Sequence, residues 1–163
     1  MNLMFTKKKE GQLMDNDEVA EALQELQKKH IRITPQRQTI LTYLVTHHNH
    51  PTVETIYEDL NQESPNLSLA TTYNTLKLLV DLGLVIELAN GEDGVHYDYF
   101  NKPHYHIICT NCGKITDVFY DGFAKDAHRM ETEAAKQTGY QVSGNLFEIY
   151  GLCPECQAKL KTK

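Results

Sequence analysis

Four cysteines in two Cys-x-x-Cys pairs limit what this chain can fold into more than any other feature. Cys109 and Cys112 form the first pair, and Cys153 and Cys156 form the second. Two such pairs on tight turns offer the closed tetrahedral set of thiolates that structural zinc prefers. A redox dithiol is the alternative, but two matched pairs in one small region favour zinc. The pairs therefore predict a zinc site that clips the C-terminal segment to the start of a small domain, which should unfold when zinc is lost.

A second group of possible metal ligands precedes the first cysteine pair and carries nitrogen and oxygen donors. His104 and His106 are two residues apart, so on a β-strand both imidazoles project from one face. Asp98 and His96 share one face of the strand expected before them. Imidazoles and carboxylates without a thiolate suit iron(II) or manganese(II) at least as well as zinc. The sequence thus predicts two metal sites, one with soft thiolate ligands and one with harder nitrogen and oxygen ligands.

Length, charge and hydropathy restrict the class of protein and its partners. The 163 residues suffice for one ordinary domain or two small ones, and a core can form without disulfides. No apolar run is long enough for a membrane helix, and no apolar segment follows Lys7-Lys8-Lys9 as in a signal peptide. The expected location is the cytoplasm, where cysteines stay reduced. The net charge of −6 argues against binding nucleic acid through a diffuse positive potential, so a DNA partner would need a small local surface, doubled by dimerisation.

The N-terminal part of the chain predicts four helices. Residues 1–14 lack a periodic pattern, and we take them as a mobile extension. Apolar residues then recur at helical spacing in four segments. The first is expected to begin at Asp15, and the others follow the caps Thr34, Thr52 and Ser68.

Two segments after the fourth helix predict a β-hairpin. Leu84–Leu88 and Val95–Phe100 are rich in β-branched and aromatic residues, and the turn-forming residues Ala89–Gly94 connect them. Helices followed by a hairpin is the order of a winged helix-turn-helix, which we assign to residues 15–100. In that arrangement the fourth helix enters the major groove of DNA and the hairpin lies over the DNA backbone.

The expected outward face of the fourth helix carries short polar side chains that can reach base edges or phosphates. These residues are Thr71, Thr72, Asn74 and Thr75. Lys77 and Arg37 add local positive charge. The alternative for each residue is an ordinary solvated helix face.

The C-terminal part of the chain predicts a small domain of strands and one helix. His104–Ile108 and Lys114–Tyr120 are strand-like and flank the first cysteine pair. Apolar residues at helical spacing begin at Phe123, and Gly139 ends that helix. Gln141–Leu152 is again strand-like and leads into the second cysteine pair. We assign this domain to residues 101–163, and the fold class is therefore α+β.

Six short segments between about Asp17 and Gln157 carry a resemblance to a known family. They are Arg32-Ile-Thr-Pro-Gln-Arg37, His50-Pro-Thr52, Ser68-Leu-Ala-Thr-Thr-Tyr-Asn74, His104-Tyr-His106-Ile-Ile-Cys109, Cys112-Gly-Lys-Ile115 and Glu148-Ile-Tyr-Gly151. Together they resemble the ferric uptake regulator superfamily of bacterial metalloregulators, and most closely its peroxide-sensing branch. The resemblance implies a homodimer that binds double-stranded operator DNA. Each subunit would have an N-terminal winged helix and a C-terminal dimerisation domain held by a four-cysteine zinc site.

The resemblance also implies the roles of particular residues. The regulatory metal site would consist of His50, Asp98, His104, His106 and Asp117, and Arg37, Tyr73 and Asn74 would lie at the operator. Adding the polar face of the fourth helix, the candidate DNA-binding residues are Arg37, Ser68, Thr71, Thr72, Tyr73, Asn74 and Lys77. Metal in the regulatory site would lock the two winged helices at the spacing of two half-sites. Asp98 points to the peroxide-sensing branch, because similar iron sensors tend to carry glutamate there.

The chemistry implied by that branch is iron-catalysed oxidation of a ligand. Iron(II) would reduce peroxide, and the oxidant would attack the imidazole of His50 or His104. The oxidised ligand would release the metal and end repression, whereas manganese(II) would support repression without sensing. The protein is consumed as it signals, so we do not expect an enzyme.

Three alternatives remain open. Within the superfamily, the chain could respond to iron, manganese or zinc availability. His104, His106 and Asp98 also resemble the facial triad of a non-haem iron oxygenase, but a set of five ligands and the lack of obvious substrate-pocket residues argue against that class. The third alternative is a zinc-held interaction domain.

Three positions depart from the family pattern. Thr72 replaces a valine usual in the recognition helix, and His30 stands where glycine is common. His96 occupies a position where peroxide sensors lack a histidine, so it is either an extra ligand or a residue of the wing.

Overall fold

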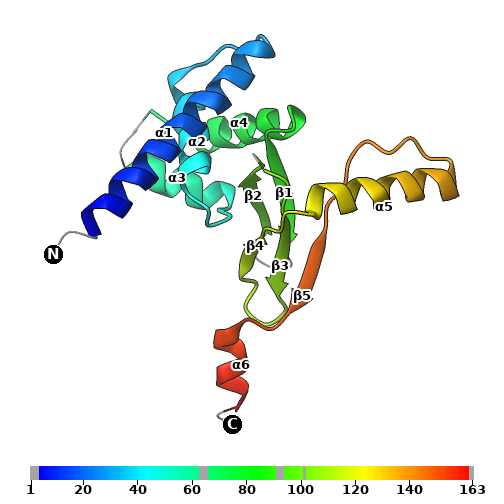
Figure 1. Ribbon diagram of the computed structural model, residues 1–163. Helices are drawn as coiled ribbons and strands as arrows, with labels where there is room; N and C mark the ends of the chain where they lie inside the picture. Colours follow the sequence, from blue (N-terminus) through cyan, green and yellow to red (C-terminus); the bar gives the residue numbers. More distant parts are fainter. Residues whose placement is uncertain (1–3, 63–65, 91–93, 101, 162–163) are drawn as a thin grey trace. The chain divides into compact units, whose positions relative to one another are not determined.

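The computed structural model of the chain describes residues 4–62, 66–90, 94–100 and 102–161 (Figure 1). The chain divides into two compact units, residues 1–100 and residues 101–163. Within the described residues, no helix is both long enough and apolar enough to cross a membrane.

Four helices make up most of the first unit: α1 (Met4–Lys28), α2 (Pro35–Thr46), α3 (Val53–Asn61) and α4 (Leu69–Asp81). Side-chain oxygens of Thr34, Thr52 and Ser68 accept hydrogen bonds from backbone N–H groups in the first turns of α2, α3 and α4. Each cap satisfies a donor that a helix end leaves without an intrahelical partner. The three helix starts predicted from these caps are confirmed.

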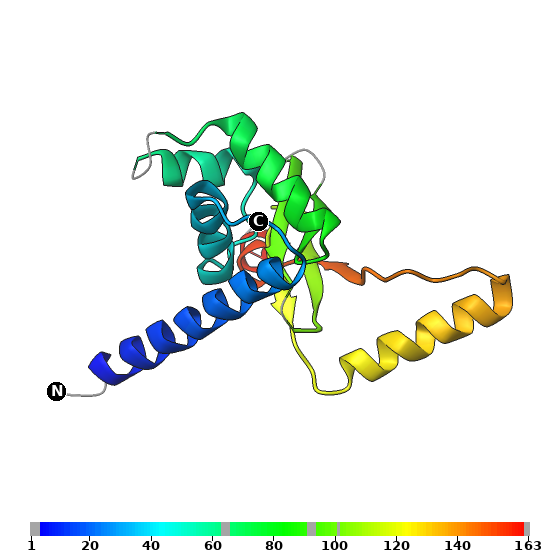
Figure 2. The same cartoon turned by 90° about the horizontal axis from the view of Figure 1, so that it is seen from above.

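Helix α1 begins at Met4, so the start expected at Asp15 is wrong (Figure 2). The segment from Lys7 to Met14 has no apolar stripe, but it is rich in Lys, Glu, Gln, Leu and Met, which have high intrinsic helix propensity. Propensity therefore continues the helix where periodicity predicted none. The mobility expected for residues 1–14 stays a prediction.

Two helices of the first unit end in the same hydrogen-bonding pattern. At the end of α4, the N–H groups of Gly83 and Leu84 donate to the carbonyls of Val80 and Leu79. This is a Schellman motif, and Gly83 occupies its left-handed position with φ 72°. Glycine adopts this conformation without steric cost, so the end of α4 follows from its local sequence.

At the end of α1, His30 takes the position that glycine holds in α4. Its N–H and that of Ile31 donate to the carbonyls of Gln27 and Leu26, and its φ is 58°. A left-handed conformation costs a residue with a side chain about 1–2 kcal/mol, whereas glycine adopts it freely. This backbone requirement explains why glycine is the usual residue in the family pattern at this point.

The core of the first unit lies between the four helices and the hairpin. Leu26, Leu41, Leu76 and Val85 have at most 1% of their surface exposed, and each comes from a different element. Burying a side chain of this size contributes about 1.5–3 kcal/mol. The core therefore holds α1, α2, α4 and β1 together as one unit.

The hairpin consists of β1 (Val85–Asn90) and β2 (Gly94–Tyr99), paired antiparallel from Val85 opposite Tyr99 to Asn90 opposite Gly94. β1 extends to Asn90, two residues beyond the predicted end, and β2 begins and ends one residue earlier than predicted. Residues 91–93 of the expected turn lie outside the described residues. Together, the helices and this hairpin form a winged helix-turn-helix.

The second unit is built on a three-stranded sheet in the order β4-β3-β5. Its elements are β3 (Tyr105–Cys109), β4 (Ile115–Val118), α5 (Phe123–Thr138), β5 (Glu148–Gly151) and α6 (Pro154–Lys161). β3 pairs antiparallel with β4 and parallel with β5. Gly139 ends α5 with φ 74°, as predicted.

Two features of the second unit differ from the prediction. The strand expected over Gln141–Leu152 is restricted to Glu148–Gly151, because the turn-forming residues Ser143-Gly144-Asn145 interrupt it and β5 pairs only with the last four residues of β3. Helix α6 was not predicted, since its eight residues show no apolar periodicity. Its start at Pro154 follows the preference of proline for the first position of a helix.

Candidate metal centres

The four cysteines lie together in the second unit. Cys109 ends β3, Cys112 lies in the following turn, Cys153 precedes α6 and Cys156 lies in its first turn. One sulfur from each residue lies within 4.8 Å of the others, and the Sγ atoms of Cys112 and Cys153 are 3.8 Å apart. Four sulfurs at about 2.3 Å from a tetrahedral zinc ion are about 3.8 Å from one another. The structure therefore brings the two predicted pairs together at a spacing that fits one zinc ion.

The turn between the first two cysteines prepares a thiolate for the metal. Gly113 adopts φ 72°, and its N–H donates to the carbonyl of Cys109 at 2.9 Å. The backbone N–H of Cys153 donates to the Sγ atom of Cys109 at 3.3 Å. Hydrogen bonds from the backbone of Cys153, Asn111 and Cys112 lower the pKa of Cys109 to about 6. Zinc binds the thiolate form, so these N–H groups favour the charge state that the metal needs.

Asn111 is a residue of the zinc site that the sequence reasoning missed. Its side-chain amide nitrogen lies 3.2 Å from the Sγ atom of Cys156, to which it donates. Partners of this kind orient metal ligands and tune their basicity. Its position inside the Cys-x-x-Cys turn could have indicated this role, because a side chain there lies beside the cysteine sulfurs.

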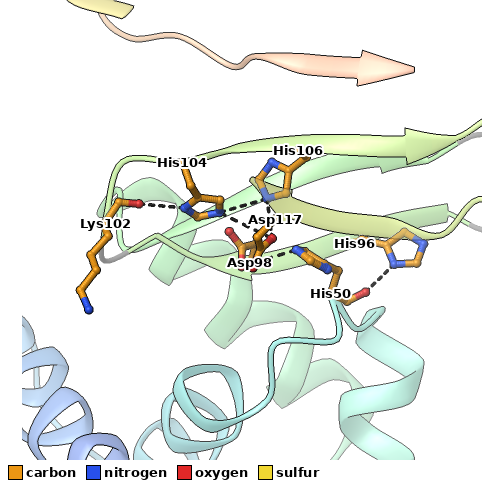
Figure 3. A network of polar contacts seen from close by, with 7 residues as sticks. All are labelled: His50, His96, Asp98, Lys102, His104, His106 and Asp117. Atoms are coloured by element: carbon orange, nitrogen blue, oxygen red, sulfur yellow. Dashed lines mark hydrogen bonds and ion pairs between the residues drawn. The ribbon is translucent and has the colours of Figure 1, made fainter. Parts of the chain in front are cut away.

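A second group of ligands in the same unit consists of His104, His106 and Asp117 (Figure 3). His106 stands opposite Asp117 in the β3–β4 register, and its Nε2 atom lies 3.4 Å from an Asp117 carboxylate oxygen. The Nε2 atoms of the two histidines are 3.1 Å apart. With metal–nitrogen bonds of about 2.1 Å, neighbouring ligand atoms on one ion are about 3.0–3.4 Å apart. The third pair, His104 Nε2 and an Asp117 carboxylate oxygen, is 3.8 Å apart, so the three ligand atoms lie close to the spacing required for one ion.

The backbone next to His104 fixes which nitrogen can bind a metal. Its Nδ1 atom lies 2.8 Å from the carbonyl oxygen of Lys102. A carbonyl only accepts hydrogen bonds, so Nδ1 carries the hydrogen and Nε2 keeps its lone pair. Both histidines are buried, with 5% and 1% of their surface exposed. The orientation and the burial suit metal ligation, since the hydrogen bond on the far nitrogen holds the ring in place.

In the first unit, His50 and Asp98 form a further buried pair. The Nε2 atom of His50 lies 3.9 Å from an Asp98 carboxylate oxygen, and 5% and 6% of the two residues are exposed. His50 adopts φ 48° although it precedes Pro51, and the residue before a proline normally has an extended backbone. Such an outlier at a buried polar residue indicates a functional position.

The outward face of α4 retains most of the candidate DNA-binding residues. Tyr73 is 53% exposed, and Ser68, Asn74 and Lys77 are also exposed. Thr71 is half-buried. Arg37, at the start of α2, is half-buried too, and its guanidinium donates to the carbonyl of Arg32 at 2.8 Å.

Thr72 and Thr75 do not lie on that outward face, so the expectation was wrong for both. Thr72 has 0% and Thr75 4% of its surface exposed, and both share a buried stripe with Leu76 and Leu79. The Thr72 hydroxyl donates to the carbonyl of Ser68 at 3.1 Å, one turn back along its own helix. Thr72 therefore fills the place of the usual valine in the core, and its extra polar group bonds within the helix.

The fold and the cysteine cluster define a winged-helix protein whose second domain is held by a four-cysteine zinc site. A sequence profile of the ferric uptake regulator family matches residues 28–150. The chain belongs to the ferric uptake regulator family.

Three proteins that are similar to this chain have names that refer to peroxide. The peroxide-responsive repressor PerR of Staphylococcus aureus (strain Mu50 / ATCC 700699) is 44% identical over 142 residues, which cover 87% of this chain and 93% of that protein. The peroxide operon regulator of Bacillus subtilis (strain 168) is 46% identical over 142 residues, covering 87% of this chain and 95% of that protein. The crystal structure of the Campylobacter jejuni peroxide stress regulator is 33% identical, has a TM-score of 0.66 and covers 82% of this chain and 98% of that one.

Proposed function

We propose that this chain is a metal-dependent, DNA-binding transcriptional repressor that senses hydrogen peroxide through iron-catalysed oxidation of a histidine ligand. The observation that carries the proposal is the group of His104, His106 and Asp117. Both histidines are buried, and the His106 Nε2 atom lies 3.1 Å from that of His104 and 3.4 Å from an Asp117 carboxylate oxygen. The similarity over 87% of the chain to relatives named for a peroxide response supports the same function.

The regulatory ion in this proposal has the five ligands that the family resemblance implies. His104, His106 and Asp117 supply three, and His50 and Asp98 supply two. Three imidazoles and two carboxylates form a set of nitrogen and oxygen donors that suits iron(II) or manganese(II). In this proposal, binding of the metal controls binding of DNA through the thermodynamic linkage between the two ligands.

The sensing reaction consumes a ligand of the repressor. Iron, when bound, supplies the electrons that cleave the O–O bond of peroxide. The imidazole of His50 or His104 then exchanges a ring C–H for C–OH, and the net reaction converts one hydrogen peroxide into water. The oxidised ring of His50 or His104 would bind the ion less well than the imidazole, and loss of the ion would end repression. Each chain reacts once, and the process is therefore a signal and not enzymatic turnover.

The proposed DNA contacts lie on α4 and at the start of α2. Ser68, Thr71, Tyr73, Asn74 and Lys77 of the α4 region would meet bases or phosphates. Arg37 would add a phosphate contact from α2. Because the net charge is −6, the binding energy must come from this local surface, used twice in a dimer. A repressor of chromosomal DNA acts in the cytoplasm.

The proposed homodimer would cover apolar side chains of the second unit. Tyr140, Leu146, Ile149 and Tyr150 are 77%, 50%, 48% and 60% exposed, and they lie within one short stretch of the chain. Large apolar residues gathered in this way mark interaction surfaces more often than ordinary solvent-facing ones. A second copy of the chain could bury the same residues from both sides, as in an isologous interface.

Peptide mass spectrometry on metal-loaded protein tests the function. Zinc-containing protein is loaded with iron(II) or manganese(II), exposed to dilute hydrogen peroxide and digested, while binding to DNA from the promoter of its own gene is measured in parallel. We expect one added oxygen on the His50 or His104 peptide with iron only, together with loss of DNA binding. Intact histidines, with DNA binding that follows the supplied metal, would instead indicate a repressor that responds to metal availability.

A further inference from the structure

His96 makes an unusual contact with the backbone of His50. Its Nδ1 atom lies 2.5 Å from the His50 carbonyl oxygen (Figure 3). Because a carbonyl only accepts hydrogen bonds, the His96 Nδ1 atom must carry the hydrogen and donate it. His96 lies on β2 two residues before Asp98, so one strand both carries a proposed ligand and holds the backbone of another.

The loop that His96 contacts adopts a conformation that needs support. The φ of His50 is 48°, which is unfavourable for a residue with a side chain. The proline that follows disfavours this conformation further, because it favours an extended backbone at the preceding residue. Neighbouring residues of β2 hold two successive carbonyls of this loop. The His96 side chain donates to the carbonyl of His50, and the N–H of Tyr97 donates to that of Pro51 at 2.9 Å. Removing the first bond would take away one of these two backbone contacts beside the strained residue.

We propose that His96 is a positioning residue for the regulatory metal: it locks the backbone of His50 so that the imidazole faces Asp98. The inference rests on the proposed function in taking His50 and Asp98 as ligands of that metal. It assigns to His96, a histidine that departs from the family pattern, a role that differs from direct ligation. Partners that orient metal ligands typically change metal affinity by about 10–100-fold.

Direct ligation through the other ring nitrogen is the competing assignment. The Nε2 atom of His96 is buried and has no hydrogen-bond partner among the described residues, and Nε2 is a common metal-binding atom of histidine. The two assignments use different nitrogens of one ring, and this difference makes them separable by substitution. An asparagine amide nitrogen occupies nearly the place of Nδ1, whereas a glutamine amide reaches nearly the place of Nε2.

Three variants distinguish these assignments: His96→Asn, His96→Gln and His96→Leu. Leucine is nearly isosteric with asparagine but cannot donate, so these two form a matched pair. Each zinc-containing variant is titrated with manganese(II), and zinc content and circular dichroism are compared with wild type. We expect His96→Asn to bind manganese(II) like wild type and His96→Leu and His96→Gln to bind it about 10–100-fold more weakly.

A second readout reports on position and not on affinity. After saturation with iron(II) and exposure to peroxide, the ratio of oxidised His50 to oxidised His104 is measured by peptide mass spectrometry. A role in positioning predicts that this ratio changes in His96→Leu and is retained in His96→Asn, since only His50 loses its anchor. A merely structural role in the hairpin would leave the ratio unchanged.

Specific outcomes would overturn the inference. Wild-type behaviour of all three variants would show that the contact has no role, and weak binding by His96→Asn with normal binding by His96→Gln would assign Nε2 as a ligand. If His96→Leu fails to fold, the asparagine and glutamine variants still decide between the two nitrogens. The variant His50→Ala separates this inference from the proposed function: unchanged manganese(II) binding in that variant would contradict the regulatory site itself.

Discussion

His106 and Asp117 stand opposite each other on neighbouring strands, and the histidine Nε2 atom lies 3.4 Å from the carboxylate oxygen. The pairing of β3 with β4 brings together two residues that are separated by the whole first zinc turn. Two of the five proposed regulatory ligands are therefore set by the pairing of β3, the strand that ends at Cys109. The cysteine cluster and this histidine–aspartate pair therefore adjoin one sheet.

Replacing Asp117 tests the site that this pairing forms. Asp117→Asn keeps the shape of the side chain but removes its negative charge. Since a ligand contributes more than its outer partners, the affinity for manganese(II) should fall by more than the roughly 10–100-fold typical of such partners. Equilibrium titration of zinc-containing protein provides the measurement. Thr116→Ala, at the exposed neighbouring position on β4, is the control and should bind manganese(II) normally. Equal affinity in both variants would remove Asp117 from the site.

Loss of one zinc ligand should unfold the second unit. Cys156→Ser leaves three thiolates, and structural zinc contributes about 10–16 kcal/mol of folding free energy in zinc-finger peptides. We expect zinc to fall well below one ion per chain and the second unit to lose its cooperative thermal transition. Metal analysis and circular dichroism measure both effects. The control Lys114→Ala removes the exposed ion pair with Glu155 and should keep zinc and the thermal midpoint. A folded, zinc-loaded Cys156→Ser variant would contradict the assignment.

Thr72 should matter for stability and not for DNA recognition. Thr72→Val keeps the shape of the side chain and removes a buried hydroxyl whose bond lies within its own helix. We expect the free energy of unfolding to stay within about 1 kcal/mol of wild type and operator affinity to be unchanged. Asn74→Ala, on the exposed face, should weaken operator binding by about tenfold, which corresponds to one lost contact of about 1–3 kcal/mol. If Thr72→Val weakened DNA binding and Asn74→Ala did not, Thr72 would belong to the DNA-binding surface.

Glycine at position 30 should stabilise the protein. His30 holds a left-handed conformation at the end of α1, and His30→Gly removes the side chain responsible for its cost. The gain should be about 1 kcal/mol, reduced by the greater freedom of glycine in the unfolded chain. Gly83→Ala occupies the matching position of α4 and should destabilise by a similar amount. Chemical denaturation of both variants measures the two changes in the free energy of unfolding. If both variants were stabilised, or both destabilised, the left-handed conformation would not explain the effect of the residue at these two helix ends.

The raised pKa of Tyr43 should make the stability of the first unit depend on pH. Burial, followed by a 2.5 Å hydrogen bond to Asp59, raises the pKa of Tyr43 from 10.0 to about 12. The neutral phenol is thus favoured in the fold, and its stabilisation is fully present below pH 10 and is lost as the pH rises through about 12.

The variant Tyr43→Phe removes this titration. It should unfold about 1 kcal/mol more easily than wild type at neutral pH, and the difference should shrink as the pH rises from 10 to about 12. Denaturation curves of both proteins across that window measure the difference. If the difference in free energy of unfolding stayed constant across that window, ionisation of Tyr43 would not affect the stability of the fold.

Features that depend on a few adjacent residues were predictable from the sequence. Thr34, Thr52 and Ser68 cap their helices because a side-chain oxygen meets an N–H group two or three residues ahead, whatever lies elsewhere. Gly83 and Gly139 end helices for an equally local reason. Each Cys-x-x-Cys pair likewise places two thiolates on one turn, so the zinc ligands could be identified before any packing was known.

Only the tertiary structure decided which faces are buried and which distant groups meet. Thr72 points into the core because α4 packs on other helices along the stripe of Leu76 and Leu79, and polarity alone predicted the opposite. Asp117 reaches His106 through strand register, and His96 reaches the His50 carbonyl across a loop. These contacts depend on long-range packing, in which the free energy of burial outweighs the local preference of any single residue.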